Sequence, residues 1–129
     1  MLRTGSDYLE SLRDGRKVYL GSERVKDVTQ HPAFRNAACS FAELYDRKRE
    51  REHVEVMSYE ENNDRFSVWF LKPRDRDGLR RRMAGHRRLA SWSYGLLGRS
   101  PDHVASFVTG LAMQPELFES NRKGFGDNL

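Results

Sequence analysis

The stretch Ser93-Tyr-Gly-Leu-Leu-Gly-Arg-Ser-Pro-Asp-His103 predicts a corner between two helices. Gly98 suits the end of the first helix, because a residue without a Cβ atom enters the left-handed conformation freely. Ser100 is then the expected N-cap of the second helix, and Pro101 its first residue. Asp102 adds a carboxylate in the first turn, where the helix dipole favours negative charge.

Arg99 therefore lies in the corner, and His103 lies about one turn into the second helix. A guanidinium and an imidazole at this spacing can both reach one small polar ligand. Ser93 and Tyr94 come shortly before the corner and are further candidates for the wall of a pocket. The spacing also fits a plain corner with a solvated arginine, so spacing alone leaves both interpretations open.

The composition fits a small soluble domain. The chain has 129 residues and a net charge of +4 from 23 basic and 19 acidic side chains, which is weak evidence for a polyanionic partner. Its single cysteine, Cys39, excludes an intrachain disulfide and a multi-cysteine metal site, and we expect it to be a small core residue. No stretch approaches the ~18 apolar residues of a membrane span and the N-terminus lacks an apolar signal core, so a cytoplasmic protein is expected.

The first half of the sequence predicts helices around a small hairpin. Ser6 or Asp7 is the expected cap of a short helix, and the glycine at position 21 fits a hairpin loop. Pro32 is the expected first residue of a long helix with an apolar stripe, and the charged run at 46–52 is its expected solvated end. The predicted elements are a helix at 8–13, strands at 17–20 and 24–28, and the helix from 32.

The second half predicts two extended segments, at 53–59 and 65–71, around a polar turn. Asp77 is the expected N-cap of the longest helix, at about 78–97. We expect a helix at 101–113 to follow the corner, and a short helix at 115–120 to follow that.

Both helices of the corner carry apolar stripes that are expected to be buried. His86 lies on the first stripe and is expected to be a core histidine rather than a ligand. The first stripe contains Leu79, Met83, His86, Leu89, Ala90, Ser93, Leu96 and Leu97, and the second contains Val104, Phe107, Val108 and Leu111.

Arginines lie mostly off the stripe of the longest helix, at positions 80, 81, 82, 87 and 88. They could form a face that follows the phosphates of a nucleic acid. They could also be a solvated face, or pair with acidic residues at 43–52. We favour the second interpretation, because the net charge is modest and no base-reading motif is present, and we expect no nucleic-acid partner.

Five short motifs occur in order along the chain. Each is weak alone, but five in one order over most of the sequence are specific. They are Arg3-Thr-Gly-Ser-Asp-Tyr8, Asp14-Gly-Arg-Lys-Val-Tyr19, Gly21-Ser-Glu-Arg-Val-Lys-Asp-Val28, His31-Pro-Ala-Phe34 and Gly98-Arg-Ser-Pro-Asp102. Together they resemble the N-terminal part of the large oxygenase component of 4-hydroxyphenylacetate 3-monooxygenase, a family that includes the pyoverdin-chromophore hydroxylases.

The resemblance implies a mostly α domain with a small β-hairpin, the N-terminal helical domain of an acyl-CoA dehydrogenase-like fold. The family's full chain is several times longer and adds a middle β domain and a C-terminal helical bundle. We therefore expect residues 1–129 to form a single, truncated, substrate-side domain.

The resemblance also implies a two-component aromatic monooxygenase that hydroxylates a phenol ortho to its hydroxyl group. Such an enzyme uses O₂ and reduced FAD delivered by a separate flavin reductase, and the full-length family implies a homo-oligomer. Most FAD contacts would lie beyond residue 129, so no cofactor-binding residue is expected within this sequence. No metal ligand is expected either.

By the same resemblance, the family's corner arginine maps to Arg99, where a fixed guanidinium favours negative charge on the phenol oxygen. The position one turn on is commonly a tyrosine in the family and is His103 here. An imidazole can donate the same hydrogen bond or take the proton, but the departure leaves the exact substrate open. Arg99 and His103 are thus the expected catalytic residues. The expected substrate-binding residues are Ser93, Tyr94, Arg99, Ser100, Asp102 and His103.

The alternative is a catalytically inactive, truncated domain that associates with itself or with a partner through uncovered apolar stripes. A middle β domain and a helical bundle encoded downstream would favour the enzyme. Trp69, Trp92 and Tyr94 could line an aromatic pocket, although aromatic residues at such spacings are usually core residues.

Overall fold

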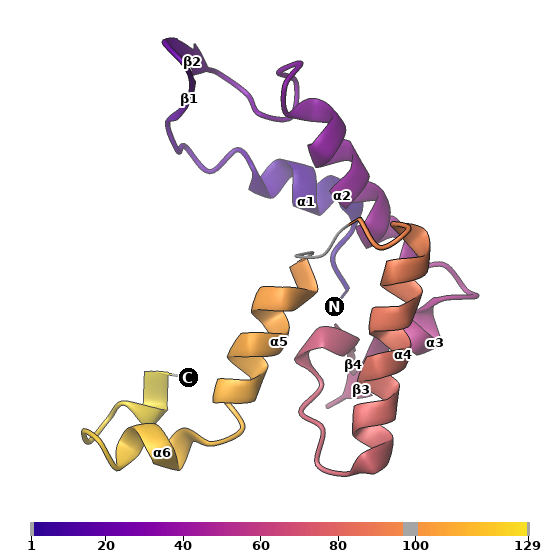
Figure 1. The fold of residues 1–129 in the computed structure, drawn as a ribbon, viewed down its shortest axis with the longest axis vertical. Coiled ribbons are helices and arrows are strands. Elements are labelled where there is room, and N and C mark those ends of the chain that lie inside the picture. Colours follow the sequence, from indigo (N-terminus) through magenta and orange to yellow (C-terminus); the bar gives the residue numbers. More distant parts are fainter. Residues whose placement is uncertain (1, 97–100, 129) are drawn as a thin grey trace. The chain divides into compact units, whose positions relative to one another are not determined.

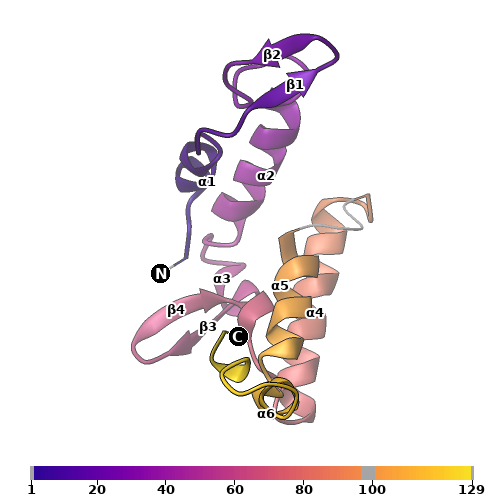
Figure 2. The same ribbon diagram turned by 90° about the vertical axis from the view of Figure 1, so that its left-hand side faces the viewer.

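The structure, a computed structural model, describes residues 2–96 and 101–128 (Figure 1). The chain forms two compact units, Met1–Val54 and Glu55–Leu129. The described residues are about half helical, which confirms the helical part of the predicted class. Each unit contains one two-stranded antiparallel hairpin, whereas the resemblance implied a single small hairpin (Figures 1 and 2). No helix within the described ranges is both long enough and apolar enough to cross a membrane.

The first unit pairs two helices and adds a hairpin. Gly5 and Tyr8 lie on the contact between the helices: Gly5 is buried, and the ring of Tyr8 stacks on that of Tyr45 with centroids 5.0 Å apart. The elements of this unit are α1 (Gly5–Ser11), β1 (Val18–Leu20), β2 (Glu23–Val25) and α2 (Arg35–Arg47).

The N-terminal cap of α1 differs from the prediction. Thr4, rather than Ser6 or Asp7, is the N-cap, and its hydroxyl accepts a hydrogen bond from the backbone N–H of Asp7 at 3.0 Å. Asp7 takes part as the third helical residue, since its carboxylate accepts from the backbone N–H of Thr4 at 2.8 Å. This reciprocal pair is a capping box, and it moves the start of the helix three residues earlier than predicted.

The predicted hairpin is confirmed at β1 and β2. Val18 pairs with Val25 and Leu20 with Glu23, so the turn consists of Gly21 and Ser22 alone. Gly21 has a φ of 61°, a conformation that glycine adopts without steric cost. The second strand ends at Val25, three residues before its predicted end.

The start of α2 and the burial of Cys39 were predicted wrongly. His31 to Phe34 form a turn, in which the carbonyl of His31 accepts from the N–H groups of Phe34 and Arg35 at 2.9 Å each. The helix therefore begins at Arg35 rather than at Pro32. Cys39 is exposed, because Ala38 and Ala42 face the core instead.

The charged run after α2 is only partly solvated, contrary to the prediction. Lys48 is buried with 7% of its surface exposed, and its ammonium nitrogen lies 4.2 Å from the ring centroid of Tyr45. The aliphatic part of a lysine can cover apolar surface while its charge contacts the face of an aromatic ring. Lys48 thus closes the end of the first unit's core.

The second unit places short elements before two longer helices. The segments predicted as extended are extended only in part, because residues 54–57 and 68–70 are helical. The hairpin turn consists of Asn62 and Asn63, with φ values of 53° and 62°. The elements are α3 (Val54–Met57, which starts at the unit boundary), β3 (Ser58–Glu61), β4 (Asp64–Ser67), the 3₁₀ helix η1 (Val68–Phe70), α4 (Arg76–Trp92), α5 (Pro101–Leu111), α6 (Pro115–Glu119) and the 3₁₀ helix η2 (Gly126–Asn128).

The cap and the buried face of α4 also differ from the prediction. Asp75, not Asp77, is the N-cap, and its carboxylate accepts from the N–H of Gly78 at 2.7 Å. Gly85 and Leu89 are the buried residues, whereas Leu79 and Met83 are about half exposed. The face that α4 buries is therefore centred on a glycine.

Two arginines of α4 are not purely solvated. Arg81 donates to the carbonyl of Ser58 at 2.9 Å, and Arg82 donates to that of Leu71 at 3.3 Å. Burial lowers the pKa of Arg82 below its ordinary value. Arg81 thus connects α4 to the start of β3, and Arg82 connects α4 to the residue that follows η1. Both contacts favour a structural role over the phosphate-tracking role.

Candidate active-site corner

The described residues include both flanks of the predicted corner. Arg99 and Ser100 lie outside the described residues, as does Gly98. Asp102 lies in the first turn of α5, where only its backbone is described. The start of the second helix at Pro101 is confirmed. Ser93, Tyr94 and His103 are the predicted site residues whose side chains can be placed.

The first flank ends α4 five residues earlier than predicted. Tyr94 and Gly95 take the left-handed conformation, with φ values of 51° and 75°. The N–H of Gly95 donates to the carbonyl of Ala90 at 2.9 Å, five residues back, as in a Schellman-type helix end. The helix thus stops at Trp92 because Tyr94 takes the left-handed conformation directly after the cap residue Ser93, and Gly95 makes the hydrogen bond that closes the helix end.

The two polar side chains of this flank have different environments. The hydroxyl of Ser93 donates to the carbonyl of Leu89 at 3.1 Å, so its proton is committed to the helix. The ring of Tyr94 is 91% exposed. Ser93 is therefore a helix-capping residue, while Tyr94 can turn toward a ligand.

The second flank is the first turn of α5. His103 is exposed there, and Phe107, one turn further on the same face, is 63% exposed. Val104 beside them is 65% exposed. An imidazole next to exposed apolar side chains suits an aromatic ring that carries a hydroxyl group. In residues 2–96 and 101–128, no hydrogen bond or ring contact joins Ser93 or Tyr94 to His103.

A buried 3₁₀ helix lies between the two helices of the corner. Within η1, Val68 is fully buried and Trp69 is 3% exposed, and η1 contacts both α4 and α5. His86 of α4 lies against Trp69 with ring centroids 5.1 Å apart, as expected for a core histidine. The prediction placed residues 68–70 in a strand and so missed this element.

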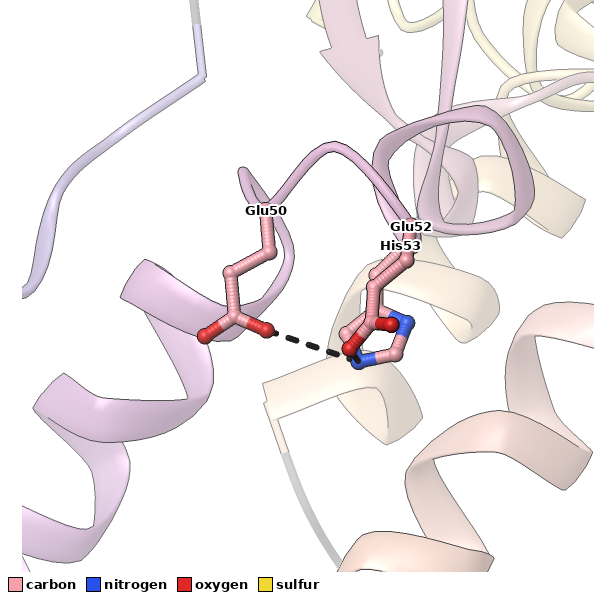
Figure 3. Close-up of side chains that lie close together, drawn as sticks. All are labelled: Glu50, Glu52 and His53. Atoms are coloured by element: carbon pink, nitrogen blue, oxygen red, sulfur yellow. Dashed lines mark ion pairs between the residues drawn. The ribbon is translucent and has the colours of Figure 1, made fainter.

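A separate group of ligand-type side chains follows α2. Figure 3 shows the carboxylates of Glu50 and Glu52 pointing toward the ring of His53. The Nε2 atom of His53 lies 3.5 Å from Glu50 Oε2 and 3.2 Å from Glu52 Oε1, and the histidine side chain is 10% exposed. Both carboxylates lie close to the same ring nitrogen, so the two acidic side chains and the histidine interact with one another. The group is an ion pair at a turn, and we assign no metal to it.

The comparison with protein families decides the identity of the chain. A family described as "4-hydroxyphenylacetate 3-hydroxylase N terminal" matches residues 4–129. The chain belongs to this family. The resemblance inferred from the five sequence motifs is thereby confirmed.

Two relatives and one solved structure show how far the 4-hydroxyphenylacetate 3-hydroxylase similarity extends. The 4-hydroxyphenylacetate 3-monooxygenase oxygenase component of Pseudomonas aeruginosa is 42% identical over 93% of this chain and 24% of the relative. A Streptomyces globisporus monooxygenase, named for a 3-amino-3-(3-chloro-4-hydroxyphenyl)propanoyl group on a peptidyl-carrier protein, is 44% identical over 97% of this chain and 23% of the relative.

The solved structure is the oxygenase component of 4-hydroxyphenylacetate 3-monooxygenase complexed with FAD and 4-hydroxyphenylacetate. It matches with a TM-score of 0.90 and 33% identity, over 98% of this chain and 26% of that one. The chain thus has the fold of this family's N-terminal part and spans about a quarter of the length of the relatives it matches.

Proposed function

We propose that this chain forms the substrate-side, N-terminal part of a two-component, FADH₂-dependent monooxygenase that hydroxylates a phenol ortho to its hydroxyl group. The observation that carries the proposal is the match over 98% of the chain to an oxygenase component complexed with FAD and 4-hydroxyphenylacetate. The partners that follow are O₂, a phenolic substrate and a separate flavin reductase. The proposal also includes a cytoplasmic location, an acyl-CoA dehydrogenase-like fold and a homo-oligomer for the whole enzyme.

In this proposal Arg99 and His103 act on the phenol oxygen. The guanidinium of Arg99 donates to that oxygen and favours its deprotonation, which makes the ortho carbon a better nucleophile. The imidazole of His103 donates a second hydrogen bond or takes the proton. Ser100, Asp102 and Tyr94 complete the wall of the pocket, and Ser93 supports it through its bond to the helix end.

The exposed side chains of α5 fit the substrate better than the cofactor. His103 offers one polar group beside the apolar surfaces of Val104 and Phe107, which suits a phenol ring. The described residues of the corner offer no row of donors for a pyrophosphate. Reduced FAD, when bound, supplies the activation of O₂, and we place most of its contacts outside residues 1–129.

Ligand binding by this chain tests the proposal. A phenol and reduced FAD would be titrated anaerobically, followed by fluorescence, into the wild-type chain and an Arg99→Ala variant. We expect a weakly bound phenol, no flavin binding, and a loss of phenol affinity of about tenfold or more on Arg99→Ala, because hydrogen bonds to charged groups contribute roughly 1.5–3 kcal/mol. Arg87→Ala removes an exposed arginine of α4 and is the matched control, with unchanged affinity expected. Equal phenol responses from all three proteins would contradict the proposal.

A second function, self-association, is favoured by one observation. Val104, Phe107 and Val108 of α5 are 45% to 65% exposed, and Leu117 of α6 is 64% exposed. Exposed apolar side chains grouped on neighbouring elements are typical of interaction surfaces. Analytical ultracentrifugation of the wild type and Leu117→Ser tests this second function, because a dimer that Leu117→Ser dissociates, in a chain that binds no phenol, would favour the interaction module.

A further inference from the structure

The 3₁₀ helix η1 contacts both helices that flank the corner, and its contact with α4 is unusually close. A Cβ atom placed on Gly85 would lie 2.6 Å from Val68 Cγ1 and 3.1 Å from Trp69 Cζ3. Val68 is fully buried and β-branched, so it cannot move aside easily. Only glycine at position 85 allows α4 to approach η1 this closely.

The contact with α5 is polar. Thr109 is 4% exposed, and its hydroxyl lies 2.7 Å from the carbonyl of Ala105 and 3.3 Å from that of Trp69. The shorter distance is inside α5, and the longer one reaches η1. An apolar residue at position 109 would leave the buried Trp69 carbonyl without this donor.

These contacts are close enough to the two flanks of the corner to determine how the flanks are placed. Gly85 precedes Ser93 by about 12 Å along α4, and Thr109 follows His103 by about 9 Å along α5, at 1.5 Å per residue. Relieving the Cβ contact from 2.6 Å to the 3.4 Å at which ordinary contacts begin requires a shift of α4 of about 0.8 Å. Shifts of this size are large for catalytic geometry, where a misplacement of about 1 Å can cost a hundredfold in rate.

We infer that η1 is the positioning element of the two flanks of the corner, and that Gly85 and Thr109 are positioning residues for Tyr94 and His103, the flank residues of the proposed phenol site. The expected effect on phenol affinity rests on the proposed function. The expected effect on the angle between α4 and α5 rests on the contacts of η1 alone. Neither residue touches the substrate. Each acts by fixing the angle and separation of the helices that carry the two flanks.

The first test compares two glycine-to-alanine variants. Gly85→Ala introduces the close contact, whereas Gly110→Ala adds a methyl group on α5 where nothing lies within 4 Å. Residual dipolar couplings of the amides of α4 and α5 measure the angle between the helices. We expect a changed angle and a phenol affinity reduced about three- to tenfold in Gly85→Ala, and no change in Gly110→Ala.

A compensating substitution separates positioning from general damage. Val68→Ala removes the Cγ1 atom that Gly85→Ala would meet, so the double variant is expected to regain the wild-type angle and a phenol affinity within about twofold of wild type. Thr109→Val and Thr109→Ser give a second test in case Gly85→Ala does not fold. Thr109→Val is expected to lose affinity about threefold, and Thr109→Ser to keep it, because serine retains the hydroxyl.

The outcomes distinguish this inference from the proposed function. An unchanged angle in Gly85→Ala, or a changed angle with wild-type phenol affinity, overturns the positioning role. Failure of the double variant to restore the angle also overturns it. If the phenol response of the wild type does not depend on Arg99, the proposed function fails, and the couplings alone then decide whether η1 sets the angle.

Discussion

The closest backbone approach in the first unit leads to a quantitative prediction for Gly5→Ala. A Cβ atom on Gly5 would lie 2.5 Å from the carbonyl oxygen of Ala42 and 2.5 Å from Asp46 Oδ2. The backbone N–H of Gly5 also donates to Asp46 Oδ1 at 2.8 Å. The substitution must therefore push α1 away from α2 by about 0.9 Å and lengthen this hydrogen bond.

The expected loss of stability follows from three terms. Overpacking costs roughly 1–3 kcal/mol, and lengthening the hydrogen bond to the carboxylate loses about 1 kcal/mol of the roughly 1.5–3 kcal/mol that such a bond contributes. Alanine regains up to about 1 kcal/mol of helix propensity over glycine. We therefore expect Gly5→Ala to lower the free energy of unfolding of this unit by about 2 kcal/mol.

Amide hydrogen exchange of α1 and α2 is the suitable assay, because both tryptophans, Trp69 and Trp92, belong to the second unit. Ser6→Ala changes the next, exposed residue of the same helix and is the matched control, expected within about 0.5 kcal/mol of wild type. Asp46→Ala removes the acceptor without crowding and is expected to cost less than Gly5→Ala. Equal protection of α1 in Gly5→Ala and Ser6→Ala would refute the close approach on which the reasoning depends.

Three further predictions concern caps, strain and acid. Asp75→Ala is expected to destabilise α4 by about 1 kcal/mol, because Asp75 caps the helix, whereas Asp77→Ala is expected to be nearly neutral. Urea unfolding followed by tryptophan fluorescence compares the free energies of unfolding of the two variants. Tyr94→Asn is expected to stabilise the end of α4 by up to about 1 kcal/mol, because asparagine tolerates a positive φ better than tyrosine does. A thermal midpoint lower than that of the wild type would contradict backbone strain at Tyr94. Hydrogen bonds from the Thr29 side chain and backbone, with one from Arg13, hold the pKa of Asp27 below its ordinary value of 3.8. This stabilisation is present above that pH and is lost as the pH falls through the folded-state pKa. Asp27→Asn is therefore expected to make the first unit's free energy of unfolding depend less on pH at acidic pH, as measured by hydrogen exchange.

Local signals predicted most of the helices but placed several of their ends wrongly. Pro101 was correct as the first residue of α5, since proline lacks the N–H that a first helical residue leaves unused. Asp75 and Asp77 are both plausible caps by residue type, and the N–H of Gly78 bonds to the first of them. The sequence cannot distinguish such neighbours, because the choice depends on how the chain before the cap approaches the helix.

The candidate site was predictable in part. The spacing of the corner predicted Arg99 and His103 as candidates, the resemblance gave them roles, and the structure adds that His103 is exposed at the start of α5. The role of η1 could not be predicted, because Val68 to Phe70 alternate like a strand and the close contact of Gly85 depends on a segment 17 residues earlier. A lone glycine inside a helical pattern was the available signal for a close approach.

The face that α5 buries decides how His103 can act. Its apolar stripe predicted burial of Val104, Phe107 and Val108, but these are exposed and Thr109 is buried, because the hydroxyl of Thr109 faces η1. His103 shares a face with Phe107, one turn away. If α5 buried its apolar stripe, His103 would also face the core, because it lies on the same face as Phe107. Burial of the opposite face instead leaves the imidazole and an apolar surface exposed together, as the proposed phenol site requires.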